Sequence, residues 1–128
     1  MKSFIDKTVK PFLVIAGLCT CTAGIYGFLP KFAVENISKM PFDKNYSMFV
    51  QHWGLMVLLA GIFMIIVAFK AAWRPPILFF VMLEKACFVF LFLTYDCQPF
   101  AVRFEGASIM DGIIAVYLLL YFRGLQKT

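Results

Sequence analysis

The chain alternates between long apolar runs and short charged segments, and this pattern predicts its helices. Four runs carry few or no charged residues: 11–30, 47–70, 75–95 and 105–123. The length of each run is close to that of a membrane-spanning α-helix, which needs about 20 residues to cross a hydrocarbon core. Because backbone polar groups cannot stay unpaired in lipid, each run is predicted to be helical. We therefore expect an all-α fold, an integral membrane bundle of four helices that forms a single transmembrane domain over residues 1–128.

The connections between these runs are unequal. Residues 31–46 form the only sizeable loop, which we place on the outer side, and apolar residues alternate with charged ones in it. This mixture predicts a short amphipathic helix lying against the membrane interface. The second run is separated from the third by Trp73, Arg74, Pro75 and Pro76. Proline ends one helix and suits the first turn of the next, so we predict a tight turn there.

The composition is that of a membrane protein. Hydrophobic residues make up 62% of the chain and charged residues 15%, and the mean hydropathy is +0.87. A soluble domain has only about 45–50% apolar residues, and a small one still exposes much of its chain to water. We therefore expect the lipid bilayer to surround this protein, and we expect no nucleic-acid partner.

The first apolar run has an alternative interpretation, a cleaved secretory signal peptide, because basic residues precede it. The apolar core of a signal peptide spans about 7–15 residues. The run between Lys10 and Lys31 is longer than that and contains no charged residue. We therefore expect that the first helix is retained.

Basic residues gather at one end of the predicted bundle. Four spans place both termini on the same side, together with the turn between the second and third spans. The charged residues of that side are Lys2, Lys7, Lys10, Lys70, Arg74, Arg123 and Lys127 against Asp6. The charges of the other two connections balance: Lys31, Lys39, Lys44 and Arg103 against Glu35, Asp43, Asp96 and Glu105. The positive-inside rule then predicts that both termini are cytoplasmic, and we attribute the net charge of +5 to contact with anionic lipid.

Small and aromatic residues predict how the helices pack. Helices approach closely in lipid where small residues share a face. Three sets of residues have this spacing: Gly54, Gly61 and Ala68; Gly17, Cys21 and Gly24; and Ser108, Asp111 and Ala115. Four aromatic residues lie near the ends of the predicted spans, where we expect them to act as interface anchors: Tyr46, Trp53, Trp73 and Tyr95.

Three ionisable residues lie inside the predicted spans: Glu84, Lys85 and Asp111. Each costs about 2.5–3.5 kcal/mol on membrane-insertion scales, so their presence requires an explanation. Adjacent helix residues point in directions about 100° apart, so Glu84 and Lys85 cannot share one direction. The arrangement that we expect pairs Lys85 with Asp111 and leaves Glu84 to titrate or to bind a ligand.

This polar set has three interpretations. It is either an ion pair that sets the register of the helices, a site that accepts protons or orients a ligand, or a contact with a partner subunit. His52 is a further polar or ligand-binding candidate at the outer end of the second span, where it would join Tyr95, Asp96 or Arg103.

Other chemistry has little support in the sequence. No second histidine or cysteine lies at ligand spacing from His52, so we expect no metal site. The cysteines, Cys19, Cys21, Cys87 and Cys97, form no C-x-x-C pair. Phosphate-binding loops and hydrolase motifs are also missing. We identify no catalytic residue, and the chain is more readily interpreted as a protein that is not an enzyme.

Several short motifs resemble those of the DoxX-like proteins, small bacterial proteins with four transmembrane helices. The motifs are Gln51-His52-Trp53-Gly54-Leu55-Met56, Gly61, Arg74-Pro75-Pro76, Glu84-Lys85-Ala86 and Asp111-Gly112, and the resemblance extends from about Gln51 to Tyr121. It implies a multi-pass protein of the bacterial inner membrane with Glu84, Lys85 and Asp111 as its polar core. It also implies a place in a thiosulfate:quinone oxidoreductase or in an oxidative-stress complex.

Three functions are compatible with these features. The first, which we expect, is a non-catalytic accessory subunit or structural component of a larger membrane complex. The second is a membrane module that binds a lipid or a quinone through its polar set. The third is a membrane subunit of a quinone-linked oxidoreductase, or a proton-linked transporter, in which Glu84 titrates. No inverted repeat is visible, so transport would require a homo-oligomer.

Overall fold

A computed structural model describes residues 2–95 and 98–127, and these residues form helices and turns without any strand. The long helices are α1 (Lys2–Cys21), α4 (Ser47–Phe69), α5 (Arg74–Thr94) and α6 (Glu105–Gln126). Shorter segments connect them: α2 (Gly24–Phe28), α3 (Pro30–Phe32), the π-helical turn η1 (Ala33–Ile37), and the 3₁₀ turns η2 (Lys44–Tyr46), η3 (Ala71–Trp73) and η4 (Ala101–Phe104).

Four helical segments of the described chain are long and apolar enough to cross a membrane. They are Lys2–Phe28, Lys44–Phe69, Ala71–Thr94 and Ala101–Gln126. The prediction of four helices of spanning length is therefore confirmed. For the last three, the predicted bounds differ from those of α4, α5 and α6 by at most a few residues, because the apolar runs there end where the helices end.

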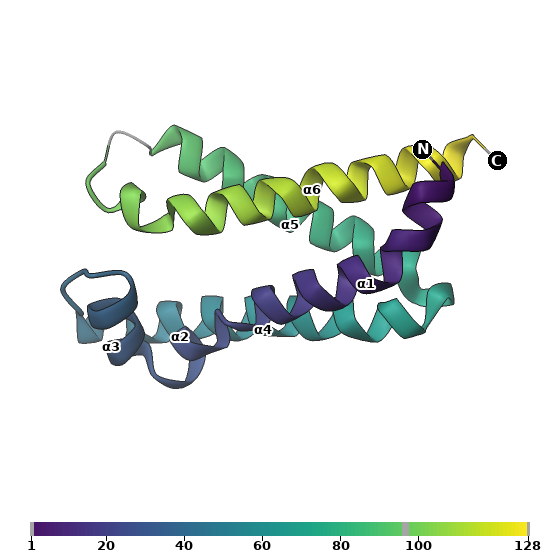
Figure 1. Cartoon of the computed structure of the whole chain (residues 1–128). Coiled ribbons are helices and arrows are strands. Elements are labelled where there is room, and N and C mark those ends of the chain that lie inside the picture. The colour runs from purple at the N-terminus through teal and green to yellow at the C-terminus, as the bar shows by residue number, and fades with distance from the viewer. Residues whose placement is uncertain (1, 96–97, 128) are drawn as a thin grey trace.

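The first helix begins earlier than predicted. We placed its start at residue 11, but α1 begins at Lys2, and Pro11 lies inside it. The reason is that Ile5 and Val9 are buried, while the charged residues between them lie on the exposed side. Figure 1 shows the first turns of α1 bending toward α6, where the Thr8 hydroxyl lies 2.8 Å from the Tyr117 hydroxyl.

The first helix is also interrupted before its predicted end. A turn at residues 22–23 separates α1 from α2, and the Thr22 hydroxyl donates a hydrogen bond to the Cys19 carbonyl at 2.6 Å. The predicted amphipathic helix in the loop 31–46 is only partly present. Helical structure ends at Ile37, and residues 39–43 have no regular structure, as expected for a segment that contains Pro41.

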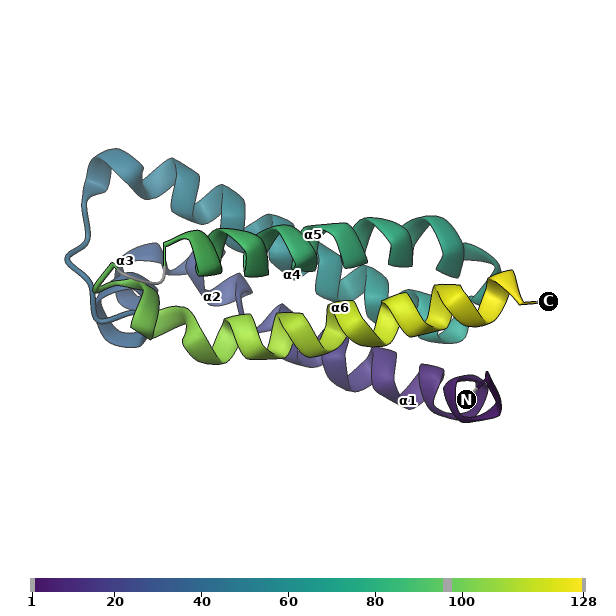
Figure 2. The same cartoon turned by 90° about the horizontal axis from the view of Figure 1, so that it is seen from above.

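The four spans form two pairs, in which α1 and α2 pack on α4, and α5 packs on α6. Additional contacts of α4 with α5 and of α1 with α6 join the pairs. Figure 1 shows that the pairs come together at the end that holds both termini and diverge toward the opposite end. The view in Figure 2 confirms that the α4–α5 turn lies at the terminal end. We call the opposite end, with η1 and η4, the distal end.

Glycines bring α1 and α4 close together, as the spacing of small residues predicted. A Cβ atom built on Gly61 would lie 2.7 Å from the carbonyl oxygen of Gly17, and one built on Gly17 would lie 2.8 Å from that of Gly61. Further along α4, a Cβ on Gly54 would collide with the backbone of Gly27 and Tyr26 in α2. The absence of side chains at these positions therefore allows the two backbones to touch.

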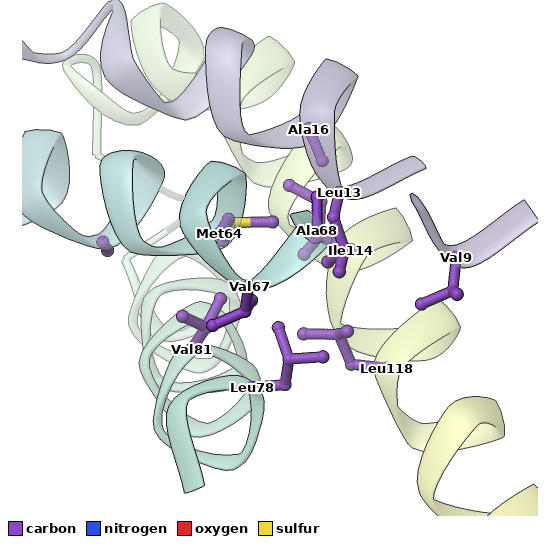
Figure 3. Packing of buried hydrophobic residues seen from close by; sticks show 11 residues of the cluster. Val9, Leu13, Ala16, Met64, Val67, Ala68, Leu78, Val81, Ile114 and Leu118 are labelled. Atoms are coloured by element: carbon purple, nitrogen blue, oxygen red, sulfur yellow. The ribbon is translucent and has the colours of Figure 1, made fainter. Parts of the chain in front are cut away.

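The main hydrophobic core lies in the terminal half of the bundle. Side chains from all four spans contribute to it: Val9, Leu13, Ala16, Ala60, Met64, Val67, Ala68, Leu78, Val81, Ile114 and Leu118. Figure 3 shows Val67 pointing toward Val81, and Leu78 toward Leu118. This core holds the two helix pairs together at one end only.

The turn between α4 and α5 forms as predicted. Pro75 and Pro76 occupy the first turn of α5, where a missing N–H group costs nothing. The Arg74 side chain folds back onto the end of α4, where Nε donates to the Val67 carbonyl at 2.8 Å and Nη2 to the Ala68 carbonyl at 2.7 Å. One guanidinium group thus satisfies two carbonyls that the helix end leaves unpaired.

Candidate functional site

A cavity of about 360 Å³ separates the two helix pairs in the distal half of the bundle. One wall comes from α1, α2 and α4, and the other from α5, η4 and α6. The cavity lining includes Thr20, Tyr26, Trp53, Glu84, Lys85, Phe88, Arg103, Phe104 and Asp111. The cavity therefore combines charged, hydroxyl and aromatic side chains within helices of membrane-spanning length.

The innermost charged pair joins α5 to α6. Lys85 Nζ lies 3.1 Å from Asp111 Oδ1, and the two residues are only 1% and 6% exposed. The predicted pairing of Lys85 with Asp111 is confirmed. Because desolvation of both charges opposes their attraction, such a pair adds little net stability, although the loss of one partner is costly.

Glu84 does not stand apart from this pair, contrary to our prediction. Its Oε2 atom lies 3.4 Å from Lys85 Nζ. The expectation that Glu84 lies outside the pair considered only the directions in which the two side chains leave the helix, whereas the titration of Glu84 or its contact with a ligand stays a prediction. The long flexible stem of lysine lets its ammonium group contact both carboxylates. Glu84 Oε2 is nevertheless buried and accepts no hydrogen bond.

Thr20 faces this cluster from α1, and sequence reasoning missed it. The residue is 1% exposed, and its hydroxyl oxygen has no hydrogen-bond partner. The spacing contained a signal, since the buried positions Leu13, Ala16, Gly17 and Thr20 recur at intervals of three and four, which places them on one helix face. A hydroxyl on the buried face of an apolar helix is a candidate for ligand contact.

Aromatic residues line the distal part of the cavity. Trp53, which we predicted to be an interface anchor, is partly buried instead and packs edge to face on Tyr26, with ring centroids 5.2 Å apart. The other three predicted anchors, Tyr46, Trp73 and Tyr95, are exposed near the ends of helices. Arg103 lines the cavity from η4, where its side chain is largely exposed.

His52 does not belong to the site. It is exposed on α4 and does not line the cavity, so the predicted polar cluster with Tyr95 and Arg103 does not form. Its neighbours Trp53 and Gly54 face the bundle, and successive helix residues point about 100° apart, which turns His52 outward. Two further residues of the predicted outer surface, Asp96 and Cys97, lie outside the described residues.

A second, apolar pocket of about 320 Å³ adjoins the first. The two share three aromatic residues, Trp53, Phe88 and Phe104. The remaining lining of the second pocket comes from the end of α5 and the segment before α6: Leu91, Phe92, Tyr95, Phe100 and Ala101. A charged cavity and an apolar one thus share a wall of aromatic rings.

Residues 2–95 and 98–127 contain neither a metal-binding cluster nor a disulfide-forming pair of cysteines. No group of three histidine, cysteine, aspartate or glutamate side chains is close enough to hold a metal ion there. Cys19, Cys21 and Cys87 are free thiols. The chemistry that the described residues bring together is therefore ion pairing and hydrogen bonding beside aromatic surface.

Comparison with known proteins adds no assignment, because no family model, no curated protein and no solved structure matches this chain. The function must therefore be argued from the geometry of the cavity.

Proposed function

We propose that this chain is a multi-pass membrane protein that binds an amphiphilic small molecule, a lipid or a quinone, in the cavity between its helix pairs. The observation that carries the proposal is the polar floor of that cavity, where Lys85 and the carboxylates of Glu84 and Asp111 lie together. A head group would contact this floor, and an apolar body would contact the aromatic walls.

A purely structural ion pair accounts for only part of this floor. Lys85 and Asp111 already form a pair that joins α5 to α6. Two more polar atoms, Glu84 Oε2 and Thr20 Oγ1, are buried at the same cavity without hydrogen-bond partners. Glu84 Oε2 has only its ion pair with Lys85 at 3.4 Å. Since the large majority of buried polar atoms in proteins have a hydrogen-bond partner, a bound molecule that supplies these partners would complete the floor.

The placement in a membrane is part of the proposal. We propose that the four helices span the bacterial inner membrane with both termini in the cytoplasm, as the positive-inside rule predicts from the basic terminal end. The cavity then lies in the outer half of the bilayer. Reporters of cytoplasmic and periplasmic location, fused after Thr128 or inserted beside Asn36, test this orientation. A periplasmic signal from the fusion after Thr128 would contradict it.

An accessory subunit of a larger complex is the second candidate function. In the most apolar stretch of each span, the buried share is 17% for Ala71–Thr94 and 22% for Ala101–Gln126. The corresponding share is 39% in each of the other two spans. The pair α5 and α6 therefore presents much apolar surface, which suits a partner subunit or a second copy of this chain as well as lipid. The resemblance to the DoxX-like proteins would make the partner part of a quinone-linked oxidoreductase.

Native mass spectrometry of the protein, extracted gently from its own membrane, tests the binding proposal. We expect one retained lipid-like or quinone-like molecule per chain, and we expect Glu84→Gln to lose it. The control is Glu105→Gln, which neutralises an exposed carboxylate outside the cavity. A stoichiometric partner protein without any retained small molecule would contradict ligand binding and favour the accessory subunit.

A further inference from the structure

Two buried atoms of the cavity lack hydrogen bonds and define what a bound head group must supply: Thr20 Oγ1, and Glu84 Oε2, which has an ion pair with Lys85 at 3.4 Å but no hydrogen bond. An ionised glutamate only accepts hydrogen bonds, so Glu84 Oε2 requires a donor. The Thr20 hydroxyl both donates and accepts. These atoms lie on opposite walls of the cavity, on α5 and α1 respectively. A head group that donates hydrogen bonds would supply the partners that these walls lack.

The charge of the floor specifies the head group further. Two carboxylates share one buried ammonium, that of Lys85, so the floor carries one excess negative charge when all three groups are ionised. An uncompensated charge is costly where water is excluded. Arg103 is the other cation of the cavity, but it is exposed at the rim, where solvent and salt screen its charge. A second buried cation would balance the floor.

The apolar pocket next to the floor provides room for the rest of the molecule. Apart from the Tyr95 and Trp53 rings, its lining side chains are all hydrocarbon. It shares Trp53, Phe88 and Phe104 with the charged cavity, so the two spaces adjoin along these rings.

We infer that the cavity binds an amphiphile with a protonated primary amine as its head, placed between Glu84 Oε2 and Thr20 Oγ1, and with its apolar body in the aromatic pocket. This inference rests on the proposed function and adds the chemistry of the head group. An ammonium group offers three N–H donors and one positive charge. A hydroxyl head would supply hydrogen bonds without the charge, and a carboxylate head would add a third negative charge to the floor.

Tryptophan fluorescence of the full-length chain in a neutral detergent tests the inference. Trp73→Phe leaves Trp53, in the shared wall, as the sole tryptophan, because the chain has only two. The probes are dodecylamine, dodecanol and dodecanoate at neutral pH, which differ only in the head group. We expect a saturable change with dodecylamine, affinity for dodecanol weaker by about tenfold or more, and no saturable change with dodecanoate. The control is the variant Trp53→Phe, which keeps only Trp73. A fluorescence change in this variant reports an effect of the probe on the micelle rather than binding in the cavity.

Two substitutions locate the head group. Glu84→Gln is expected to remove the preference for the amine over the alcohol, and Thr20→Val to weaken amine binding by about two- to tenfold, the loss of one hydrogen bond. The matched controls are Glu105→Gln and Thr94→Val, since both residues are exposed and lie outside the two pockets. If Glu84→Gln does not fold, two measurements still decide whether the cavity binds an ammonium head. They are the effect of Thr20→Val and the comparison of the three probes on the chain that keeps Glu84 and Thr20.

The possible failures are distinct. Dodecanol or dodecanoate binding as tightly as dodecylamine would overturn the ammonium assignment and leave amphiphile binding standing. If no probe gives a saturable change and the native protein retains no small molecule, both the inference and the proposed function are wrong.

Discussion

Lys85 Nζ on α5 lies 3.1 Å from Asp111 Oδ1 on α6, and both side chains are almost fully buried. In the described residues this pair is the only salt bridge that joins one long helix to another. Its energetic role depends on what remains when one partner is removed, because an unpaired buried charge is far more costly than the loss of the pair as a whole.

Removal of Lys85 should therefore destabilise the protein strongly. We expect Lys85→Ala to lower the free energy of unfolding by about 3–5 kcal/mol, because it leaves the carboxylates of Asp111 and Glu84 without their cation. Asp111→Asn in the same chain should restore part of the loss by removing one charge. Denaturant titration in mixed micelles measures Lys85→Ala, Asp111→Asn and the double variant. Strictly additive effects of the two substitutions would reject the pairing.

The contact of α4 with α2 predicts an unusually sensitive glycine. A Cβ atom at Gly54 would meet the backbone of Gly27 and Tyr26, which no rotamer change can move away. We expect Gly54→Ala to lower the stability by about 1–3 kcal/mol, the usual cost of overpacking. Thermal unfolding in detergent measures this loss.

Gly124 provides the matched control for Gly54, since it also lies in a long helix and a Cβ there has nothing within 4 Å. Gly124→Ala should be neutral or raise the stability by about 0.5–1 kcal/mol, because alanine is the better helix former. Equal losses at both positions would mean that α4 and α2 are not in backbone contact.

The turn between α4 and α5 predicts that arginine and lysine are not equivalent at position 74. Arg74 donates to two carbonyls of α4 through two different nitrogens. The single ammonium of a lysine cannot reproduce this fork. We expect Arg74→Lys to cost about 1.5–3 kcal/mol, the range for a hydrogen bond to a charged group. Hydrogen exchange should also quicken at the amides of the last turn of α4.

Arg123→Lys is the control for the turn, because Arg123 is exposed near the end of α6. The change keeps the charge and should alter the stability little. A loss at position 123 that matches the loss at position 74 would show that the cost does not come from the fork of hydrogen bonds at Arg74, and no loss at position 74 would show that its charge alone matters.

The sequence predicted the features that depend on local order along the chain. Apolar runs located the last three spans, because the hydropathy of a segment does not depend on its neighbours. The proline pair after Arg74 predicted the turn, since proline restricts its own backbone. The spacing of small residues predicted that Gly17, Gly54 and Gly61 lie at helix contacts, although not which helices meet there. The scarcity of charge inside the spans predicted the pairing of Lys85 with Asp111.

Only the tertiary structure decided which way individual side chains face. In a soluble protein, polar residues mark the outer face of a helix. Helix α4 is apolar on all sides between Gly54 and Phe69, and lipid is as apolar as a protein core, so hydropathy does not distinguish its faces. For this reason the sequence did not predict that Trp53 lines the cavity while His52 faces outward.

The site itself is also a tertiary feature. Thr20, Glu84 and Asp111 lie far apart along the chain, and the cavity that they share exists because the helix pairs meet at the terminal end and diverge at the distal end. Local sequence determined the four helices and the residue types that they carry. Packing between the helices decided which of those residues meet, because the rotation and tilt of each helix depend on contacts with the other three.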